Sequence, residues 1–414
     1  MNLFSRFKKV FLILGFLAAV FIIGYFLWSF FFKTEPVTPI ATTTPGVISG
    51  LPTAETGTTT GVTVGEGGVL PGGITIPTAI PNEGGISSVA VGGSTRTSAI
   101  TQNPTLGSTI SGDGKIQYYD KSDGKFYRLD DNGNLIALSD KTFYDVDNIV
   151  WAPDKNQAIL EYPDGNKILY NFQTQTQVTL PSHWQDFSFS PDSGQLVSKS
   201  LGLDEENRYL VVSSGDGSKA VALENIGTND KNVYSSWSPN NQIVAMYTEG
   251  LDFNRQEVFF VGLNGENFKS TIVEGRGFES KWSTTGDKLL YSVYSTDTNL
   301  NPQLWIVGAT GDTIGQDRKS ISLNTWADKC TFASNNEVYC AVPETLEKGS
   351  GMFPELADKT KDNLYKINLT TGTKELIAIP DGAYNISEVM VPANKDALYF
   401  TDKTTGQIYK IDLP

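Results

Sequence analysis

Residues 237–248 read WSPNNQIVAMYT: a large aromatic residue, a short turn sequence and then an apolar run. The same local pattern starts at residues 151, 189, 282, 332 and 391, with the turn sequences WAPD, FSPD, WSTTG, FASN and VPAN. Successive starts are 38, 48, 45, 50 and 59 residues apart. A period of about 40–50 residues filled by short strands is typical of the four-stranded blades of a β-propeller.

The turn chemistry predicts antiparallel strands on both sides of each repeat start. Proline fixes φ in the turn, and the Asp or Asn that follows accepts hydrogen bonds from nearby backbone N–H groups. Candidate third strands lie at residues 125–129, 208–212, 257–261, 303–307, 363–367 and 407–411, and Gly-containing turns lead from several of them to a fourth strand. We therefore expect an all-β fold.

Strands from both ends of the chain are expected to close the ring. A further blade precedes the first repeat, with strands near residues 106–110, 115–120, 125–129 and 135–138, whereas the last repeat supplies only three strands. Residues 96–101 can pair with residues 407–413 as the missing outer strand, which removes free sheet edges. Seven blades are favoured, with six or eight as the alternatives.

The Trp-Ser-Pro-Asp/Asn turns resemble those of TolB-like propellers within the wider WD-repeat-like group, and the resemblance covers residues 106–414. Residues 398–413 also resemble one blade of a YWTD-type propeller. The Trp-Asp dipeptide of true WD repeats is absent, so their usual hydrogen-bond network is not carried over. The resemblance implies a propeller of the bacterial envelope behind an N-terminal membrane anchor.

The N-terminal part predicts a membrane anchor and a linker. Residues 10–32 are 23 residues without a charge, long enough to span a membrane as a signal anchor, and the alternative is a cleaved signal peptide. Arg6, Lys8 and Lys9 precede this segment, which places residues 1–9 in the cytoplasm and the rest outside the cell membrane. Residues 33–94, rich in Thr, Pro and Gly, are expected to be a disordered linker, and residues 95–414 the propeller.

Charge and composition exclude several functions. The net charge is −14, which disfavours nucleic acid as a partner, because phosphate binding needs a basic surface. One His and two Cys leave little for a zinc site or a Ser-His-Asp triad. We therefore predict no catalytic, metal or cofactor residues and no cofactor. The alternative is an envelope hydrolase that uses carboxylates on the wide face of the propeller.

The two cysteines are predicted to form a disulfide. In a hairpin that turns at Asn335, Cys330 and Cys340 lie directly opposite each other, which brings their Cβ atoms near bonding range. A location outside the cell permits oxidation. Two buried free thiols are the alternative.

Long links point to one face of the ring as the binding face. Links from second to third strand and from blade to blade open on the same face, here called the wide face, and residues 201–207, 249–255, 295–302 and 343–362 make long links there. Binding residues often lie on such loops. The candidate binding residues are Trp184, Phe278, Trp326 and Phe353; the alternative is that these aromatics only fill loop packing. The expected partner is a protein or an envelope polymer.

Overall fold

The computed structural model describes Ile22, Tyr25 and residues 85–130 and 133–414. The expected cytoplasmic N-terminus, the expected transmembrane segment apart from Ile22 and Tyr25, and residues 33–84 of the expected linker lie outside the described residues. No helix within the described part of the chain is long and apolar enough to cross a membrane.

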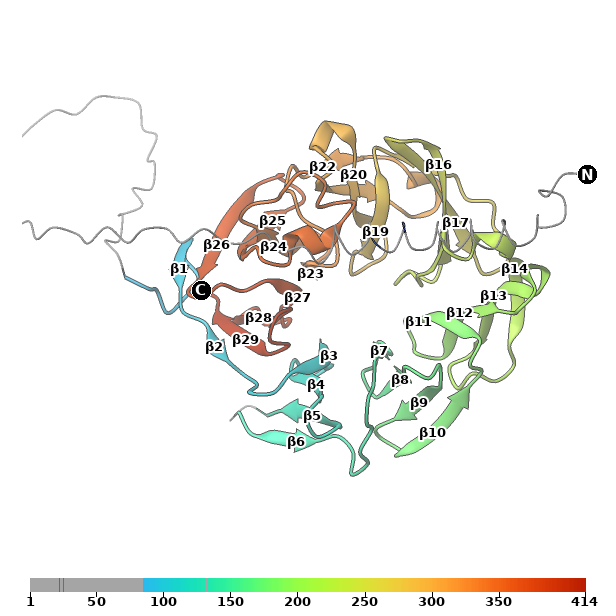
Figure 1. Cartoon of the computed structure of the whole chain (residues 1–414), viewed down its shortest axis with the longest axis horizontal. Coiled ribbons are helices and arrows are strands. Elements are labelled where there is room, and N and C mark those ends of the chain that lie inside the picture. Colours follow the sequence, from blue (N-terminus) through green and yellow to red (C-terminus); the bar gives the residue numbers. More distant parts are fainter. Residues whose placement is uncertain (1–21, 23–24, 26–84, 131–132) are drawn as a thin grey trace, which may run out of the picture. The chain divides into compact units, whose positions relative to one another are not determined.

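Seven sheets stand around a central axis, so the prediction of an all-β propeller with seven blades is confirmed (Figure 1). The inner strands are β3 (Thr105–Ile110), β7 (Asn148–Trp151), β11 (Trp184–Phe189), β15 (Val233–Ser235), β19 (Arg276–Trp282), β23 (Cys330–Ser334) and β27 (Ile386–Met390). The second strands are β4 (Ile116–Asp120), β8 (Gln157–Glu161), β12 (Gln195–Leu201), β16 (Ile243–Asp252), β20 (Lys288–Tyr294), β24 (Glu337–Pro343) and β28 (Ala397–Asp402).

We number the blades 1 to 7 in chain order, so that blade 1 contains β3 and blade 7 contains β27. The two outer strands of each blade continue the same antiparallel order. The third strands are β5 (Lys125–Leu129), β9 (Lys167–Asn171), β13 (Arg208–Ser214), β17 (Arg255–Gly262), β21 (Pro302–Gly308), β25 (Asp362–Asn368) and β29 (Ile408–Asp412). The outer strands are β6 (Leu135–Ala137), β10 (Thr176–Leu180), β14 (Val221–Asn225), β18 (Thr271–Val273), β22 (Lys319–Ser320), β26 (Lys374–Pro380) and, in the last blade, β2 (Ser98–Ala99). Short 3-10 helices lie in the connections: η1 (Glu205–Asn207), η2 (Gly227–Asn229), η3 (Thr296–Thr298), η4 (Gly311–Thr313) and η5 (Pro354–Ala357).

The ring closes as predicted, with one strand from the N-terminal side. Strand β2 pairs antiparallel with β29 and supplies the outer strand of blade 7. A second N-terminal strand was not expected: β1 (Gly93–Thr95) pairs parallel with β26 at the edge of blade 6. Residues before the expected boundary at residue 94 also contact the propeller: Ala90 is buried, and its N–H donates a hydrogen bond to the carbonyl of Asp412 at 2.9 Å.

The turns between first and second strands follow the predicted chemistry. Asp192 Oδ1 accepts hydrogen bonds from the backbone N–H of Gly194 at 3.0 Å and from Ser190 Oγ at 2.5 Å. In the next blade, Asn240 Oδ1 accepts a hydrogen bond from the backbone N–H of Gln242 at 3.1 Å. These local bonds explain why the same turn sequence recurs in consecutive blades.

Apolar side chains fill the junctions between neighbouring blades, where the core lies. Blades 4 and 5, for example, share a cluster that contains Met246, Phe260 and Tyr291. Polar atoms at the inner strands tie neighbours together as well: Trp151 Nε1 donates to the carbonyl of Gly107 at 2.7 Å, and Trp282 Nε1 donates to Ser236 Oγ at 2.9 Å. Each blade therefore depends on both of its neighbours for burial of its faces.

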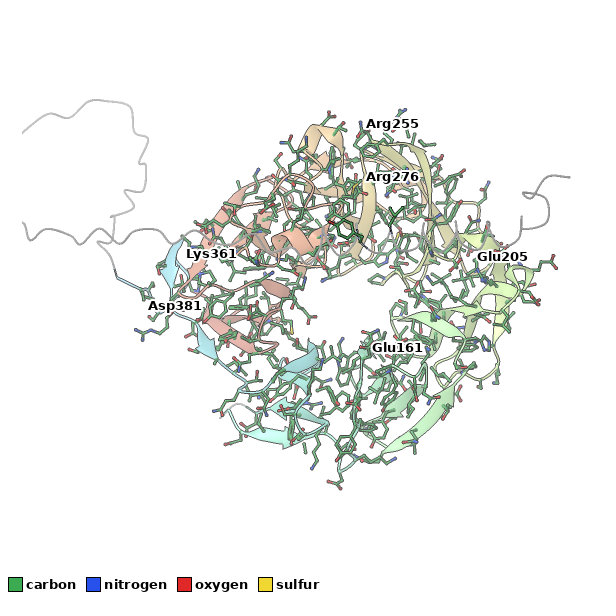
Figure 2. The ribbon with its side chains drawn as sticks, viewed as in Figure 1. Glu161, Glu205, Arg255, Arg276, Lys361 and Asp381 are labelled. Atoms are coloured by element: carbon green, nitrogen blue, oxygen red, sulfur yellow. A yellow bond between two sulfur atoms is a disulfide. The ribbon has the colours of Figure 1, made fainter. Side chains whose placement is uncertain are left out.

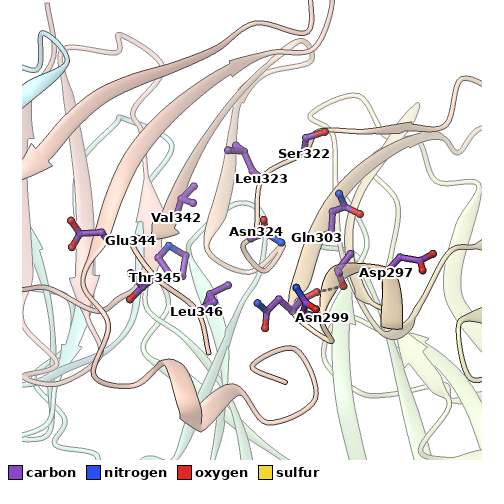
Figure 3. Close-up of a pocket in the computed structure, with 13 residues that line it drawn as sticks. Asp297, Asn299, Gln303, Ser322, Leu323, Asn324, Val342, Glu344, Thr345 and Leu346 are labelled. Carbon is purple, nitrogen blue, oxygen red and sulfur yellow. Dashed lines mark hydrogen bonds between the residues drawn. The ribbon is translucent and has the colours of Figure 1, made fainter. Parts of the chain in front are cut away.

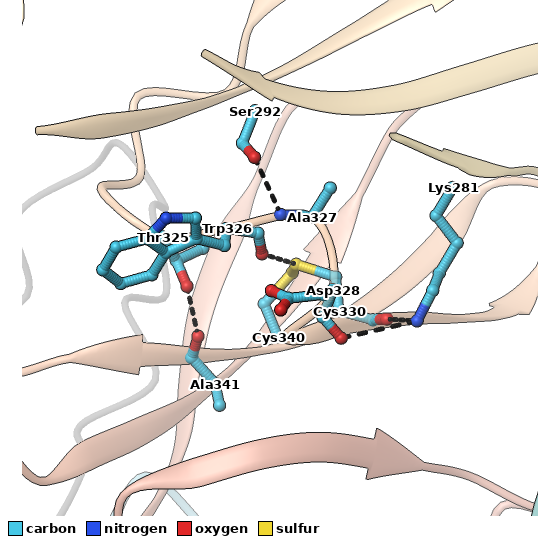
Figure 4. The surroundings of a disulfide bond; sticks show 9 residues. All are labelled: Lys281, Ser292, Thr325, Trp326, Ala327, Asp328, Cys330, Cys340 and Ala341. Atoms are coloured by element: carbon cyan, nitrogen blue, oxygen red, sulfur yellow. Dashed lines mark hydrogen bonds between the residues drawn. A yellow bond between two sulfur atoms is a disulfide. The ribbon is translucent and has the colours of Figure 1, made fainter. Parts of the chain in front are cut away.

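The predicted disulfide is present in blade 6 (Figure 4). Cys330 in β23 and Cys340 in β24 are register partners, and both are fully buried. Blade 5 contacts this strand pair, because Lys281 Nζ donates a hydrogen bond to the carbonyl of Cys330 at 2.7 Å. The disulfide lies in the protein interior and covalently links β23 to β24, the two inner strands of blade 6.

Candidate binding face

The four aromatic residues that the sequence placed on the wide face differ in their exposure to solvent. Trp184, Phe278 and Trp326 are only 5%, 5% and 7% exposed, and Phe353 is 51% exposed. Trp184 packs in the junction of blades 2 and 3, and Phe278 in that of blades 4 and 5. These three side chains are therefore buried rather than displayed on the wide face, whereas Phe353 is exposed to solvent.

Other exposed apolar side chains on the wide face had not been singled out from the sequence. They lie in links from second to third strand or from blade to blade: Tyr144, Leu203, Leu251, Phe253 and Leu356. Leu251 and Phe253 stand at the end of an extended hairpin, because β16 and β17 continue through the expected loop at residues 249–255 and turn between Asp252 and Arg255. These residues could have been found in the sequence as large apolar residues within the long links.

Three links over blades 4, 5 and 6 are joined by hydrogen bonds into one structure, here called the loop arch (residues 249–255, 295–302 and 343–362). The β16–β17 hairpin contacts η3, because Asn254 Nδ2 donates to Thr296 Oγ1 at 2.7 Å and its Oδ1 accepts from the Thr296 N–H at 2.9 Å. The blade 5 link then meets the blade 6 link, where Gly349 N–H donates to Asn299 O at 3.0 Å and Gly351 N–H to Leu300 O at 2.8 Å. The arch is therefore continuous over three blades.

The middle of the arch has unusual backbone geometry. Asn299 and Leu300 have φ angles of 57° and 59°, in the left-handed region that branched or bulky residues rarely adopt. Their carbonyls are the two acceptors that hold Gly349 and Gly351. A side chain in place of Gly351 would meet Leu300 O at 2.7 Å, so glycine is required for this close contact. Such strain is kept where the surrounding structure fixes it, and it recurs at functional sites.

A buried ion pair fixes the blade 6 end of the arch. Lys329 Nζ lies 2.8 Å from Asp362 Oδ2 and 3.1 Å from Asn385 Oδ1. Asn385 Nδ2 in turn donates to the carbonyl of Asp358 at 3.0 Å, and the Ile386 N–H donates to Asp362 Oδ2 at 2.6 Å. Burial is the main influence on Asp362 and raises its pKa, while the Lys329 ammonium opposes the shift. The long link that carries Phe353 is thus held at its base.

Two hollows open along the arch. The first, of about 560 Å³, lies between blades 5 and 6 and is lined mainly by polar groups, including Asp297, Asn299, Asn324 and Glu344 (Figure 3). The second, of about 570 Å³, is lined by residues of blades 4 and 5, among them Phe253, Arg255 and Trp305. Both volumes suit a small ligand or a side chain of a partner.

Charged side chains also gather along the inner strands at the channel. Burial raises the pKa of Glu388 in β27, which accepts a hydrogen bond from Ser108 Oγ at 3.0 Å, and the charges of Lys281 and Lys155 oppose that shift. Desolvation by surrounding protein atoms, followed by repulsion from Asp328, raises the pKa of Glu279 to about 7, but the residue is exposed and solvent screening weakens this effect. Among the described residues, no group of three or more His, Cys, Asp or Glu side chains could hold a metal ion.

The fold and these sites define a seven-bladed β-propeller. No protein-family model and no curated protein sequence matches the chain. Among solved structures, the chain is similar to the Swd1 β-propeller domain of Myceliophteria thermophila, with 12% identity, a TM-score of 0.51, and coverage of 77% of this chain and 100% of that one. It is also similar to a streptogramin B lyase, with 12% identity, a TM-score of 0.51, and coverage of 77% and 97%.

These likenesses concern the fold alone. The architecture is shared by the Swd1 β-propeller domain and by a lyase, and the arrangement of blades does not by itself identify a function. A function for this chain has to be argued from its own side chains.

Proposed function

We propose that this protein is a membrane-anchored, extracytoplasmic recognition propeller of the cell envelope that binds its partner on the loop arch. The expected partner is a protein or an envelope polymer. The location follows from the apolar segment at residues 10–32 and from the resemblance to anchored TolB-like propellers.

The observation that supports this proposal is the exposure of large apolar side chains on a backbone that is already fixed. Phe253 and Phe353 are 52% and 51% exposed, at the two ends of the arch, and Leu356 lies beside Phe353 in η5. Hydrogen bonds between the links and the Lys329–Asp362 pair hold the backbone beneath them. Binding to such a surface orders few residues, which leaves more of the contact energy for affinity.

Site-specific photo-crosslinking of the full chain in intact envelopes tests the proposal. A photoreactive residue at position 353 should capture a discrete species, and the same residue at position 192, on the face of tight turns, should not. The double substitution Phe353→Ser/Leu356→Ser should abolish capture from position 253 without unfolding, because both side chains are exposed. Capture of the same species from position 192, and none from 253 or 353, would show that the partner binds the face of tight turns and would contradict the proposal.

The alternative, a carboxylate-based hydrolase, stays a prediction. One observation favours it: a carboxyl group such as Glu279, whose pKa is raised to about 7, can donate a proton near neutral pH. It lies on an inner strand at the channel and not on the arch. Cleavage of a neutral oligosaccharide by the full chain, lost in Glu279→Gln, would favour the hydrolase; an oligosaccharide that stays intact would count against it.

A further inference from the structure

The hollow between blades 5 and 6 has an apolar wall and a negatively charged rim. Leu323, Val342 and Leu346 form the wall, and the carboxylates of Asp297 and Glu344 lie on opposite sides of it (Figure 3). The other lining side chains are neutral, and none of the residues that line the hollow is Lys, Arg or His. The lining therefore carries two negative charges and no positive one.

The two carboxylates differ in how they are paired. Asp297 is the second residue of η3 and is exposed, and its side chain makes no ion pair or hydrogen bond with any described residue. Glu344 pairs with Lys361 at 3.1 Å, but both side chains are about half exposed, so water screens this pair. A cation that enters the hollow would meet one carboxylate that is unpaired and one that is only weakly paired.

Side-chain amides add further acceptors to the rim. Asn324 Nδ2 donates to the carbonyl of Pro302 at 3.1 Å, which leaves its Oδ1 as an acceptor. The side chains of Asn299 and Gln303 make no hydrogen bond within the described part of the chain, so their amide oxygens are also available. An ammonium or guanidinium group needs several acceptors, because it has three or five N–H donors. The rim offers them together with negative charge.

The neighbouring hollow between blades 4 and 5 shares Asp297 but differs in its other charges. Its carboxylates Asp252 and Glu274 are already paired, with Arg255 at 2.7 Å and with an arginine of blade 5 at 3.1 Å. Arg276 also donates to the backbone carbonyl of Asp252 at 3.0 Å (Figure 2). A basic ligand there would have to displace a guanidinium group, so it would favour the hollow between blades 5 and 6.

We propose that the hollow between blades 5 and 6 binds a Lys or Arg side chain of a protein partner. Such a side chain has an aliphatic stem, which can lie on the apolar wall, and a cationic head, which can reach the carboxylates of the rim. The volume of about 560 Å³ admits either side chain. A metal ion would make no use of the wall, and an uncharged sugar would leave both carboxylates without a cation.

Exposed aromatic residues in the loop arch favour a polypeptide as the source of this side chain. Phe253 in the blade 4 link and Phe353 in the blade 6 link are half exposed. The blade 5 link lines the hollow and joins these two links. A peptide with apolar residues on either side of a Lys or Arg would match this order. The proposal rests on the proposed function for the location of the binding face, and it names the partner chemistry there.

Binding of model peptides to the detergent-solubilised full chain tests this site. The probes are the dye-labelled pentapeptide Ala-Phe-Lys-Phe-Ala and its counterparts with Arg, norleucine or Glu in the middle, followed by fluorescence anisotropy with protein-free detergent as the blank. The Lys and Arg peptides should bind roughly three- to tenfold more tightly than the norleucine peptide, and the Glu peptide should bind most weakly. High salt should reduce this preference, because ions screen the carboxylates.

Asp297→Asn and Asp312→Asn form a matched pair of variants. Asp312 takes the same position in η4 that Asp297 takes in η3, in the same blade, and is also exposed, but it lies in the turn from third to fourth strand on the opposite face. Asp297→Asn should weaken the Lys peptide roughly three- to tenfold and leave the norleucine peptide unchanged. Asp312→Asn should bind every peptide as the parent does, and both variants should keep the parent Tm.

Three outcomes would overturn the site for a basic side chain. The first is that no peptide binds, or that the Lys and norleucine peptides bind equally. The second is an equal loss in Asp297→Asn and Asp312→Asn, which would show that only the overall negative charge attracts the peptide. The third is capture of a polysaccharide, and no protein, by photo-crosslinking from position 353.

The failure of this site and the failure of the proposed function can be told apart. If the Lys peptide shows no preference but photo-crosslinking from position 353 still captures a partner, the proposed function stands and the basic side chain is wrong. Conversely, a preference for the Lys peptide that is lost in Asp297→Asn, without capture in intact envelopes, would support the site and remove the wider proposal.

Discussion

Replacement of Lys329 by Met should destabilise the propeller strongly, and more so at high pH. The substitution leaves the Asp362 carboxylate, which is 1% exposed, with the Ile386 N–H at 2.6 Å as its remaining strong donor. Loss of one partner of a buried ion pair costs about 3–5 kcal/mol. Unfolding entropy for a domain of this size is roughly 0.7 kcal/mol per degree, so Tm should fall by roughly 4–8 °C at pH 8.

The pH dependence follows from the direction of the Asp362 shift. Burial raises the pKa of Asp362, and without Lys329 nothing of comparable size opposes that effect. A carboxyl whose pKa is higher in the folded state binds more protons there, so stability is lost as pH rises through the folded-state pKa. The Tm deficit of Lys329→Met should therefore shrink between pH 8 and pH 5.

Thermal unfolding followed by circular dichroism at both pH values measures this effect. Lys361→Met is the matched control: Lys361 pairs with Glu344 at 3.1 Å, but both side chains are about half exposed, and such pairs contribute about 0–1 kcal/mol. The double variant Lys329→Met/Asp362→Asn should recover stability at pH 8, because the amide oxygen still accepts from Ile386. A deficit of less than 1 °C at pH 8, or an equal deficit at both pH values, would refute the reasoning.

Three further predictions concern closure, oxidation and the channel. Deletion of residues 1–101 bares the edges of β26 and β29, so sedimentation should show self-association and calorimetry a lower Tm, whereas deletion of residues 33–82 alone should show neither. Replacement of Cys330 and Cys340 by Ala should lower the free energy of unfolding by about 2–3 kcal/mol, as measured by urea denaturation; an unchanged value would contradict the stapling role. In Glu279→Gln the fall in Tm of the parent protein as pH rises through about 7 should become smaller, by a modest amount because Glu279 is exposed to solvent; identical Tm profiles from pH 5 to pH 8 would count against it.

The blade repeat could be predicted because each turn carries its own chemistry. Strand pairing, ring closure by β2 and the facing cysteines all follow from local patterns and from spacing along the chain. Strand β1 could not be predicted in this way. Its three residues, GST, have no apolar alternation, and its parallel pairing with β26 uses backbone groups.

The inward orientation of Trp184 could not be derived from strand alternation. Alternation from Phe189 back along β11 gives Phe187 and then Gln185 as the inward residues, which would turn Trp184 outward. A bulge between Gln185 and Ser188, with Asp186 at a φ of 56°, breaks this alternation and turns Trp184 inward. An extra residue of this kind leaves no reliable mark in one sequence.

The Lys329 cluster shows a second limit of sequence analysis. Lys329, Asp362 and Asn385 come from three separate segments around blades 6 and 7, and no local pattern in the sequence links them. Their proximity is a product of the ring itself.

The two faces of the ring differ in which side chains they leave exposed, and this difference bears on where a partner can bind. On the face of tight turns, side chains make the bonds between blades: Asn240 Nδ2 donates to the carbonyl of Gly286 at 2.9 Å, and Lys395 pairs with Glu337 at 2.7 Å. Those side chains are occupied, and a partner would have to break the bonds that hold the ring. On the loop arch, backbone groups join the links of blades 5 and 6, and the Asn254 side chain joins those of blades 4 and 5, whereas the large side chains of Phe253 and Phe353 remain exposed. Substitutions of these exposed side chains can change what is bound with little loss of stability. The entropy cost of ordering the links arises when the ring folds and not when the partner binds.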